Sequence, residues 1–129
     1  MTTFTGITPN LVVADIAKSI AFYRDVLGFS MITTVPEEPP YIFALMQRDG
    51  VSVFLNDLAA AKQDPATPAL TFGNTAMLYF TVTGIQPLYE AIRGQATIAM
   101  PLKQQFYGMT EFSVFDPDGY VVVIGERHA

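Results

Sequence analysis

The side chains that could perform acid–base or metal chemistry are few in this sequence. Its 129 residues include no cysteine and a single histidine, His128, next to the C-terminal residue. Thiolate nucleophiles, sulfur-ligated zinc and a metal held by a histidine pair are therefore excluded. The 12 Asp and Glu residues remain. Glu111 is the most informative of them, because it lies in an otherwise apolar strand pattern.

The alternation of side chains predicts that Glu111 shares one strand face with Ser113 and Phe115. A carboxylate on an apolar sheet face can bind a cationic ligand, or act as a base if burial raises its pKa. In the simpler alternative, Glu111 is a partly exposed strand residue that pairs with Lys103 or Arg127. The sequence leaves both interpretations open.

Two further segments carry groups of possible functional importance. Phe106 and Tyr107 precede Gly108 and would present aromatic surface at a loop, suited to stacking on a planar ligand or a cation. Packing in the core or in a subunit interface is the alternative. The segment from Asp116 to Gly119 contains two carboxylates, but its spacing is typical of a turn. Phosphate-binding glycine loops and serine nucleophile elbows are absent from the sequence.

Composition restricts the class of protein. Half of the residues are hydrophobic and 15% are charged, which excludes intrinsic disorder. No apolar run approaches the roughly 18 residues that span a bilayer, and the first residues lack the pattern of a signal peptide. We therefore expect a cytoplasmic protein without membrane contact. Its apolar residues should fill a core, a ligand cavity or a subunit interface.

The charge balance argues against a nucleic-acid partner. Seven basic and 12 acidic residues give a net charge of −5, whereas phosphate contacts need clustered Lys and Arg. An acidic chain would suit a cationic ligand, although mild acidity also serves solubility. The length supports one compact domain or two half-size modules that share a core.

An internal repeat organises the whole chain. Asp49-Gly50 and Asp118-Gly119 lie 69 positions apart. The same offset relates Val13-Ala14-Asp15-Ile16 to Val82-Thr83-Gly84-Ile85, and Phe43 and Leu45 to Phe112 and Val114. Three agreeing matches indicate duplication of one structural unit.

Each half predicts a strand, a helix and three further strands. The first helix should begin after Asp15 as N-cap and end at Gly28, and Asp49-Gly50 should form a hairpin turn. The expected elements of the first half are a strand at 7–13, a helix at 16–27 and strands at 29–35, 41–47 and 51–56. Those of the second half are a strand at 77–82, a helix at 85–92 and strands at 96–100, 110–115 and 120–124.

The sequence thus predicts an α+β protein of two tandem βαβββ modules within a single domain, residues 1–129. The first module should cover about 4–58, a linker about 59–74 and the second module about 75–127. One face of each sheet is covered by its helix, so the other face must find cover elsewhere. Two such sheets closing on each other would make a cupped site.

Two segments carry a family resemblance. Val13-x-Asp15-x-x-x-Ser19-x-x-Phe22-Tyr23-x-x-Val26-Leu27-Gly28-Phe29 resembles the first-module signature of the vicinal oxygen chelate superfamily, which includes glyoxalase I, extradiol dioxygenases and bleomycin-resistance proteins. The segment from Tyr107 to Gly119 resembles the late second-module motif, in the form common among bleomycin-resistance-like members. The resemblance implies the paired-module fold, which hosts several chemistries.

Enzymes of this superfamily hold a divalent metal through His, Glu or Gln side chains on the cupped sheets. The resemblance and the repeat place the corresponding positions at Thr8, Phe54, Met77 and Val123. None of these is a normal ligand for Mn, Fe, Ni or Zn. A slip of one residue gives Pro9, Leu55, Leu78 and Ile124, which are no better. We therefore expect no metal and no other cofactor.

The same alignment predicts an apolar cup with a few polar groups, as is typical of a small-molecule site. Its expected ligand-binding residues are Asn10, Phe54, Asn56, Met77, Tyr79, Phe106, Tyr107, Glu111 and Phe115. In the alternative, some of these side chains only fill space between modules or form a dimer core. A register error of one residue would move a strand's set to the opposite face.

Three functions are compatible with these observations. The first is a non-catalytic homodimer, similar to bleomycin-resistance proteins, that binds an aromatic or cationic, antibiotic-like small molecule without a metal. Related proteins often form the cup across subunits. The second is a divergent, metal-free lyase or isomerase that uses Glu111 or Tyr79 in proton transfer. The third is a scaffold dimer with no ligand.

Overall fold

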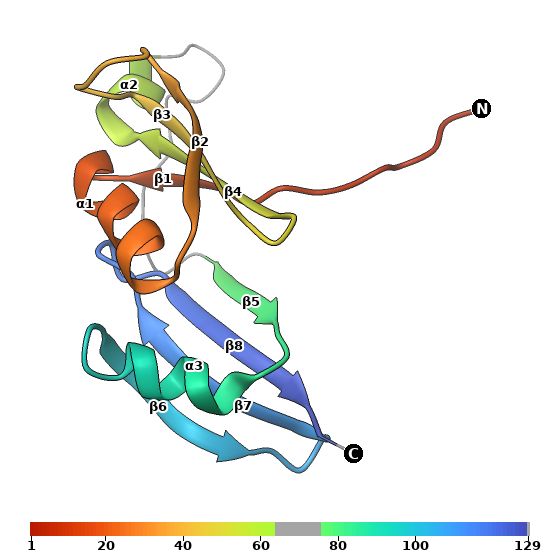
Figure 1. Cartoon of the computed structure of the whole chain (residues 1–129). Coiled ribbons are helices and arrows are strands. Elements are labelled where there is room, and N and C mark those ends of the chain that lie inside the picture. The colour runs from red at the N-terminus through yellow and green to blue at the C-terminus, as the bar shows by residue number, and fades with distance from the viewer. Residues whose placement is uncertain (64–75, 129) are drawn as a thin grey trace.

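The chain forms two four-stranded sheets, each with its own covering helix (Figure 1). The computed structural model describes residues 1–63 and 76–128. The first module contains β1 (Asn10–Val13), α1 (Ile16–Ala21), the π-helical turn η1 (Phe22–Val26), β2 (Ser30–Val35), β3 (Phe43–Arg48) and β4 (Val51–Asp57). A short helix, α2 (Leu58–Gln63), follows. The second module contains β5 (Met77–Thr81), α3 (Ile85–Ile92), β6 (Thr97–Gln104), β7 (Met109–Phe115) and β8 (Val121–Arg127).

The two sheets have the same topology. Their strand orders are β1-β4-β3-β2 and β5-β8-β7-β6, with one parallel pair in each, β1 with β4 and β5 with β8. Asn10 lies opposite Phe54, and Tyr79 lies opposite Val123, so the offset of 69 relates the two registers. The predicted α+β fold of two βαβββ modules is confirmed.

Local signals behave as the sequence predicts. The Asp15 side chain caps α1 by accepting a hydrogen bond from the Lys18 N–H (3.2 Å). Gly28 has φ +75°, the left-handed conformation that ends a helix. Asp49 and Gly50 both have positive φ, 50° and 82°, as a two-residue type I′ hairpin requires.

Several boundaries differ from the prediction; β8, for example, ends at Arg127 rather than at residue 124. The helix expected at 16–27 changes to a π turn after Ala21, because the Leu27 N–H bonds to the Phe22 carbonyl five residues back (3.2 Å). β6 continues past Pro101 to Gln104, since an edge strand tolerates a missing N–H on its free side. The first strand starts at Asn10 rather than residue 7, because the chain before Pro9 leaves the sheet.

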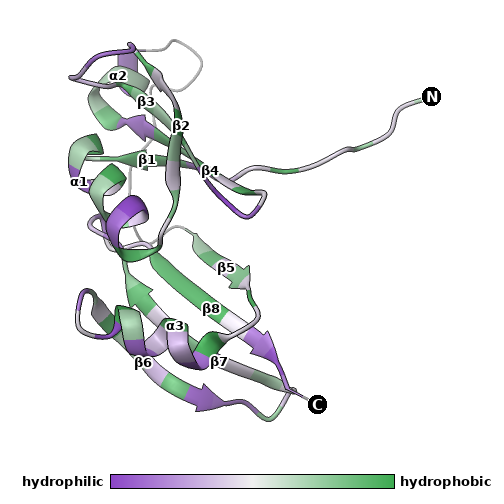
Figure 2. Cartoon of the chain, viewed as in Figure 1, coloured by the Kyte–Doolittle hydropathy of each residue, from purple (hydrophilic) through white to green (hydrophobic). Residues whose placement is uncertain are grey.

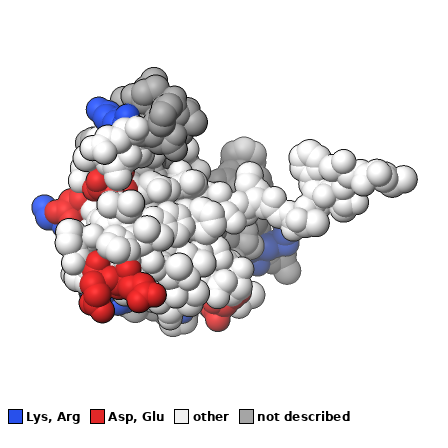
Figure 3. Space-filling model, turned by 90° about the horizontal axis from the view of Figure 1, so that it is seen from above, with Lys and Arg blue, Asp and Glu red and all other residues white. Residues whose placement is uncertain are grey.

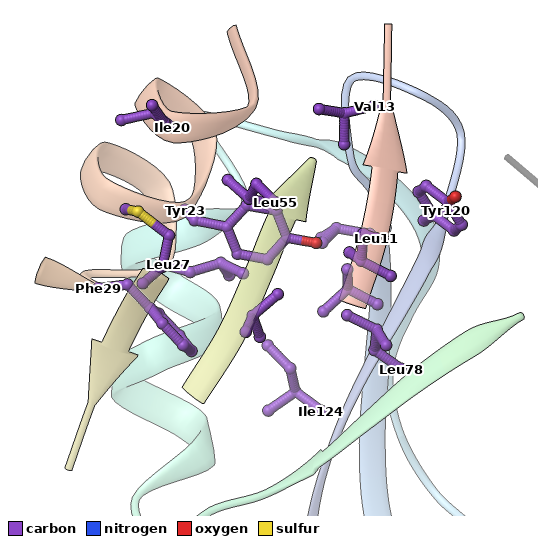
Figure 4. Packing of buried hydrophobic residues seen from close by; sticks show 14 of the residues in the cluster. Leu11, Val13, Ile20, Tyr23, Leu27, Phe29, Leu55, Leu78, Tyr120 and Ile124 are labelled. Carbon is purple, nitrogen blue, oxygen red and sulfur yellow. The ribbon is translucent and has the colours of Figure 1, made fainter. Parts of the chain in front are cut away.

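The core is one cluster to which both modules contribute. Figure 4 shows Tyr23, Leu27 and Leu55 of the first module near Leu78 and Ile124 of the second, all buried. Full burial of each such side chain stabilises the fold by about 1.5–3 kcal/mol. The hydropathy colouring follows this packing, because β8 is apolar from Val121 to Ile124 and hydrophilic only near its end (Figure 2).

Hydrogen bonds also tie the modules together at the turn between β7 and β8. The Tyr23 hydroxyl donates to Asp116 Oδ2 (3.2 Å), and the Ala14 N–H donates to Asp118 Oδ1 (3.1 Å). Asp116 Oδ1 in turn accepts from the backbone N–H groups of Asp118 and Tyr120 (both 2.9 Å). The predicted turn therefore also joins the two modules, a role that its spacing did not indicate.

Two remaining findings concern the segments outside the sheets. α2 lies in the stretch predicted as a linker, and the rest of that stretch, 64–74, lies outside the described residues. Within the described part of the chain, no helix has the length and apolar character needed to cross a membrane.

Candidate functional site

The second sheet has one face that its helix leaves uncovered. Phe112 packs against Tyr89 of α3, with ring centroids 5.0 Å apart, so its neighbour Glu111 points to the opposite side of β7. The register places Glu111 opposite Gly125, and Tyr79 opposite Val123. We call this side, with Tyr79, Glu111, Val123 and Gly125, the open face of the second sheet.

Glu111 is held on the open face by two phenols. Its Oε2 accepts a hydrogen bond from the Tyr79 hydroxyl (2.5 Å), and its Oε1 accepts one from the Tyr107 hydroxyl (2.6 Å). The side chain is buried, with 4% of the residue exposed. The alternative ion pair with Lys103 or Arg127 is not among the ion pairs of the described residues. Charge-assisted hydrogen bonds of this length are strong and offset part of the free energy of burying a carboxylate.

The two phenols stay protonated at neutral pH. Desolvation, followed by the hydrogen bond to Glu111, raises the pKa of Tyr79 to about 12, and the nearby Arg127 guanidinium opposes the rise. The hydrogen bond to Glu111 is also the main cause that raises the pKa of Tyr107. Both hydroxyls are therefore available as donors to the carboxylate.

Exposed apolar side chains surround this group. Phe106 packs edge-to-face on Tyr107, with ring centroids 5.1 Å apart, and is itself almost fully exposed. Met77 and Phe115 are also exposed. An exposed set of large apolar side chains is typical of a ligand or protein contact surface.

The other three predicted site residues form a separate group in the first module. Asn56 donates an amide hydrogen bond to Asn10, and Phe54 packs against Phe43 with ring centroids 5.3 Å apart. No hydrogen bond or ring contact among the described residues links this group to Tyr79 or Glu111. The structure thus places the nine residues in two groups rather than around one enclosed cup.

Two cavities of the described chain lie mainly away from the predicted residues. One of about 560 Å³ lies between α1 and the loop before β3, with Asp15 and Tyr41 in its wall. The other, of about 910 Å³, lies between the modules, with Phe29 and Phe80 in its wall. Of the predicted residues, only Tyr79 lines either cavity. The exposed members of the predicted set, such as Met77 and Phe106, lie on the surface of the single chain.

The residues at the superfamily's metal positions do not fit a metal. Thr8 is exposed in the segment before β1, Phe54 packs against a second phenylalanine, and Val123 is buried. Met77 supplies only a thioether, whereas Mn, Fe, Ni and Zn prefer imidazole or carboxylate donors. Among the described residues, no group of three or more His, Asp or Glu side chains is placed to hold a metal ion.

Sequence reasoning did not identify Gly125. A Cβ atom built at this position would lie 2.2 Å from the Tyr79 hydroxyl oxygen and 2.8 Å from Tyr79 Cζ. Tyr79 therefore reaches Glu111 by passing over a residue without a side chain. No local sequence signal indicates this role, because it depends on the order of the strands.

Comparison with known proteins agrees with this architecture. The model of the Glyoxalase/Bleomycin resistance protein/Dioxygenase superfamily matches residues 5–124. The chain belongs to this superfamily. A bleomycin resistance protein from Geobacillus stearothermophilus is 32% identical over 124 residues, which cover 88% of this chain and 90% of that protein.

Solved structures share the superfamily fold. A protein of unknown function from Agrobacterium tumefaciens has a TM-score of 0.76 and 25% identity, covering 98% of this chain and 96% of its own. TnmS3, an antibiotic binding protein from Streptomyces sp. CB03234, has a TM-score of 0.76 and 17% identity, covering 98% of both chains. At that identity the likeness to TnmS3 shows the fold alone.

Proposed function

We propose that this superfamily member binds an aromatic or cationic, antibiotic-like small molecule without a metal. One observation carries the proposal: Glu111 is a buried carboxylate whose described hydrogen-bond partners are two phenols, on a face lined by exposed aromatic rings. The similarity to a bleomycin resistance protein supports the same interpretation.

The chemistry of the open face suits such a ligand. Phe106, Tyr107 and Phe115 offer ring faces for stacking, and a cation placed over such a ring gains about 0.5–2 kcal/mol. The charge of Glu111 adds attraction through the phenols. The residues at the superfamily's metal positions lack suitable donors, so binding would rest on these contacts.

We further propose that two copies of the chain together enclose the site. Residues 1–8 form an arm that stands clear of the body (Figures 1 and 3). Its Phe4 and Ile7 are 94% and 96% exposed. Met77 and Phe115 on the open face are further exposed apolar side chains that a partner surface could bury. A second copy would bury these apolar side chains and turn the open face into a pocket.

A metal-free enzyme is the second candidate, favoured by the 2.5 Å hydrogen bond between Tyr79 and Glu111. Such a pair can hold and move a proton. The pKa of Tyr79, about 12, keeps the phenol protonated at neutral pH, so Glu111 would be the base.

A ligand screen with a charge-deletion variant tests the proposal. Bleomycin and other aromatic, cationic antibiotics are added to the full chain, and thermal unfolding is followed. A ligand at 100 times its Kd stabilises the folded state by about 2.7 kcal/mol, a shift of about 10 °C at this size. Glu111→Gln should weaken binding of a cationic hit about tenfold. Glu90→Gln, an exposed change on α3, should not.

The outcomes separate the candidates. A chemically altered ligand, detected by mass spectrometry, would support the enzyme. Turnover that depends on a stoichiometric bound metal would contradict the metal-free proposal. A wide library without a single hit would favour a scaffold dimer.

A further inference from the structure

We propose that the phenol oxygens of Tyr79 and Tyr107 form a pair of hydrogen-bond acceptors that selects ligands with N–H donor groups, and that Gly125 is the positioning residue for this pair. The inference rests on the proposed function, because it names the ligand chemistry of that same site. In a simple carboxylate site the carboxylate oxygens contact the ligand, whereas here the phenol oxygens do.

The direction of the hydrogen bonds fixes the character of the site. A carboxylate accepts hydrogen bonds and a phenol has one proton. The single protons of Tyr79 and Tyr107 point at Glu111 Oε2 and Oε1. Only lone pairs of the two phenol oxygens then remain for a ligand, and the charge behind them makes these oxygens stronger acceptors.

Exposure shows which residues a ligand would meet. Glu111 is 4% exposed, whereas Tyr79 and Tyr107 are 48% and 51% exposed. The carboxylate is thus covered by the residues that it orients. An ammonium, amidinium, guanidinium or amide N–H can donate to the phenol oxygens. A ligand carboxylate would bring lone pairs and negative charge against them.

The strand order explains why position 125 must lack a side chain. β8 lies between β5, which carries Tyr79, and β7, which carries Glu111. Tyr79 therefore crosses β8 at Gly125, where an added Cβ would lie 2.2 Å from the hydroxyl oxygen. The φ angle of Gly125 is outside the left-handed range, so the need for glycine comes from the phenol and not from the backbone.

The first module provides an internal comparison. At the repeat offset, Asn56 occupies the position of Gly125 and Asn10 that of Tyr79, with matching registers. There, both positions carry side chains, and the two amides bond directly to each other. In the second module, the glycine on the middle strand leaves the space through which the Tyr79 phenol reaches Glu111.

A matched pair of probes tests the inference: 2-naphthamidine, which carries N–H donors, and 2-naphthoate, which carries only acceptors. Both are titrated into the full chain at neutral pH, with ligand-detected NMR to measure Kd. We expect naphthamidine to bind at least ten times more tightly. Tyr79→Phe and Tyr107→Phe should each weaken naphthamidine binding about tenfold, the range for one charge-assisted hydrogen bond.

Variants at position 125 test the positioning role. Gly125→Ala should weaken naphthamidine binding as much as Tyr79→Phe, and the two changes together should weaken it no further. Gly94→Ala is the matched control, because a Cβ there meets no atom within 4 Å. Tyr41→Phe, in the first module, is the control for the tyrosine changes. Both controls should change Kd less than twofold.

The outcomes distinguish this inference from the proposed function. Equal binding of the two probes, or unchanged naphthamidine binding in Tyr79→Phe and Tyr107→Phe, overturns the inference while the chain still binds small molecules. If neither probe binds, the inference is overturned, and the antibiotic screen alone decides the proposed function. Should Gly125→Ala fail to fold, the two tyrosine variants still decide the donor preference.

Discussion

At the residue scale, the chemistry of this chain centres on Glu111. Burial of a carboxylate is unfavourable unless its oxygens find partners, and here each oxygen accepts one phenol proton. The two tyrosines lie on different elements, Tyr79 on β5 and Tyr107 in the turn before β7. The carboxylate therefore links β5, at the edge of the sheet, to the loop between β6 and β7.

The hydrogen bond predicts how Tyr79 titrates. Its pKa in the folded chain is about 12, and Glu111→Gln should lower this pKa towards the ordinary value because the carboxylate is lost. Folded-state stability from this raised pKa is complete below the unfolded value of about 10 and is lost as pH rises through 12. Tyr Cζ chemical shifts in ¹³C-labelled protein report the titration. The signal that is absent in Tyr79→Phe assigns Tyr79, and an identical Tyr79 pKa in both proteins would refute the coupling.

At the scale of elements, the turn between β7 and β8 joins the modules by binding α1 and η1. Asp116 is buried at this contact. Burial is the main cause that raises its pKa, and hydrogen bonds from Tyr120, Asp118 and Tyr23 oppose the rise. Its charged form is thus stabilised by three donors in a buried position. Removal of one donor should weaken the link between the modules.

Tyr23→Phe tests this link. The variant leaves Asp116 with one fewer donor, and the free energy of unfolding should fall by about 1–3 kcal/mol, measured with urea. Because the folded pKa of Asp116 is raised, its contribution to stability is complete below the unfolded pKa and is lost as pH rises through the folded pKa. The loss of unfolding free energy in Tyr23→Phe should therefore be larger at neutral pH than at acidic pH.

Tyr89→Phe is the matched control for that experiment. Its ring packs against Phe112, and no hydrogen bond of its hydroxyl is found among the described residues. An equal loss of stability in both variants, or a Tyr23→Phe deficit that does not change with pH, would contradict the role of the Tyr23 hydroxyl.

At the scale of the whole molecule, the two modules share a core but leave apolar surface exposed. The arm at residues 1–8 and the open face of the second sheet are the main examples. On the side shown in Figure 3 the basic side chains lie apart from one another, and most of the surface is uncharged. The exposed apolar side chains are the basis of the proposed dimer.

Sedimentation tests the proposed dimer. The full chain should sediment at about twice its 14.1 kDa. Deletion of residues 1–8 should raise the dimer dissociation constant at least tenfold, because the interface loses the apolar contacts of Phe4 and Ile7. Thr3→Ser combined with Thr5→Ser changes the arm without removing apolar surface and should have no effect. A dimer dissociation constant of one micromolar corresponds to an association free energy of about 8 kcal/mol. A full chain that remains monomeric at about 100 μM would therefore refute the dimer.

The sequence by itself determined the modules and their turns. Hydrophobic periodicity, caps and positive-φ turns are local properties, so the 69-residue repeat, the Asp15 cap and the Asp49-Gly50 hairpin could be read from it. The unsuitable residues at the metal positions could also be identified, because the family resemblance and the repeat indicate those positions. The ends of the first helix and of β6 could not, because they depend on a π turn and on the edge position of a strand.

Only the tertiary structure decided the partners of Glu111. Lys103, Arg127 and the two tyrosines are all compatible with the sequence, and the choice depends on which strand lies between β5 and β7 and on its register there. The same holds for Gly125, which matters because Tyr79 crosses it, and for the division of the nine predicted residues into two groups. Side chains on different strands meet only through strand order and module packing, and no local pattern encodes these.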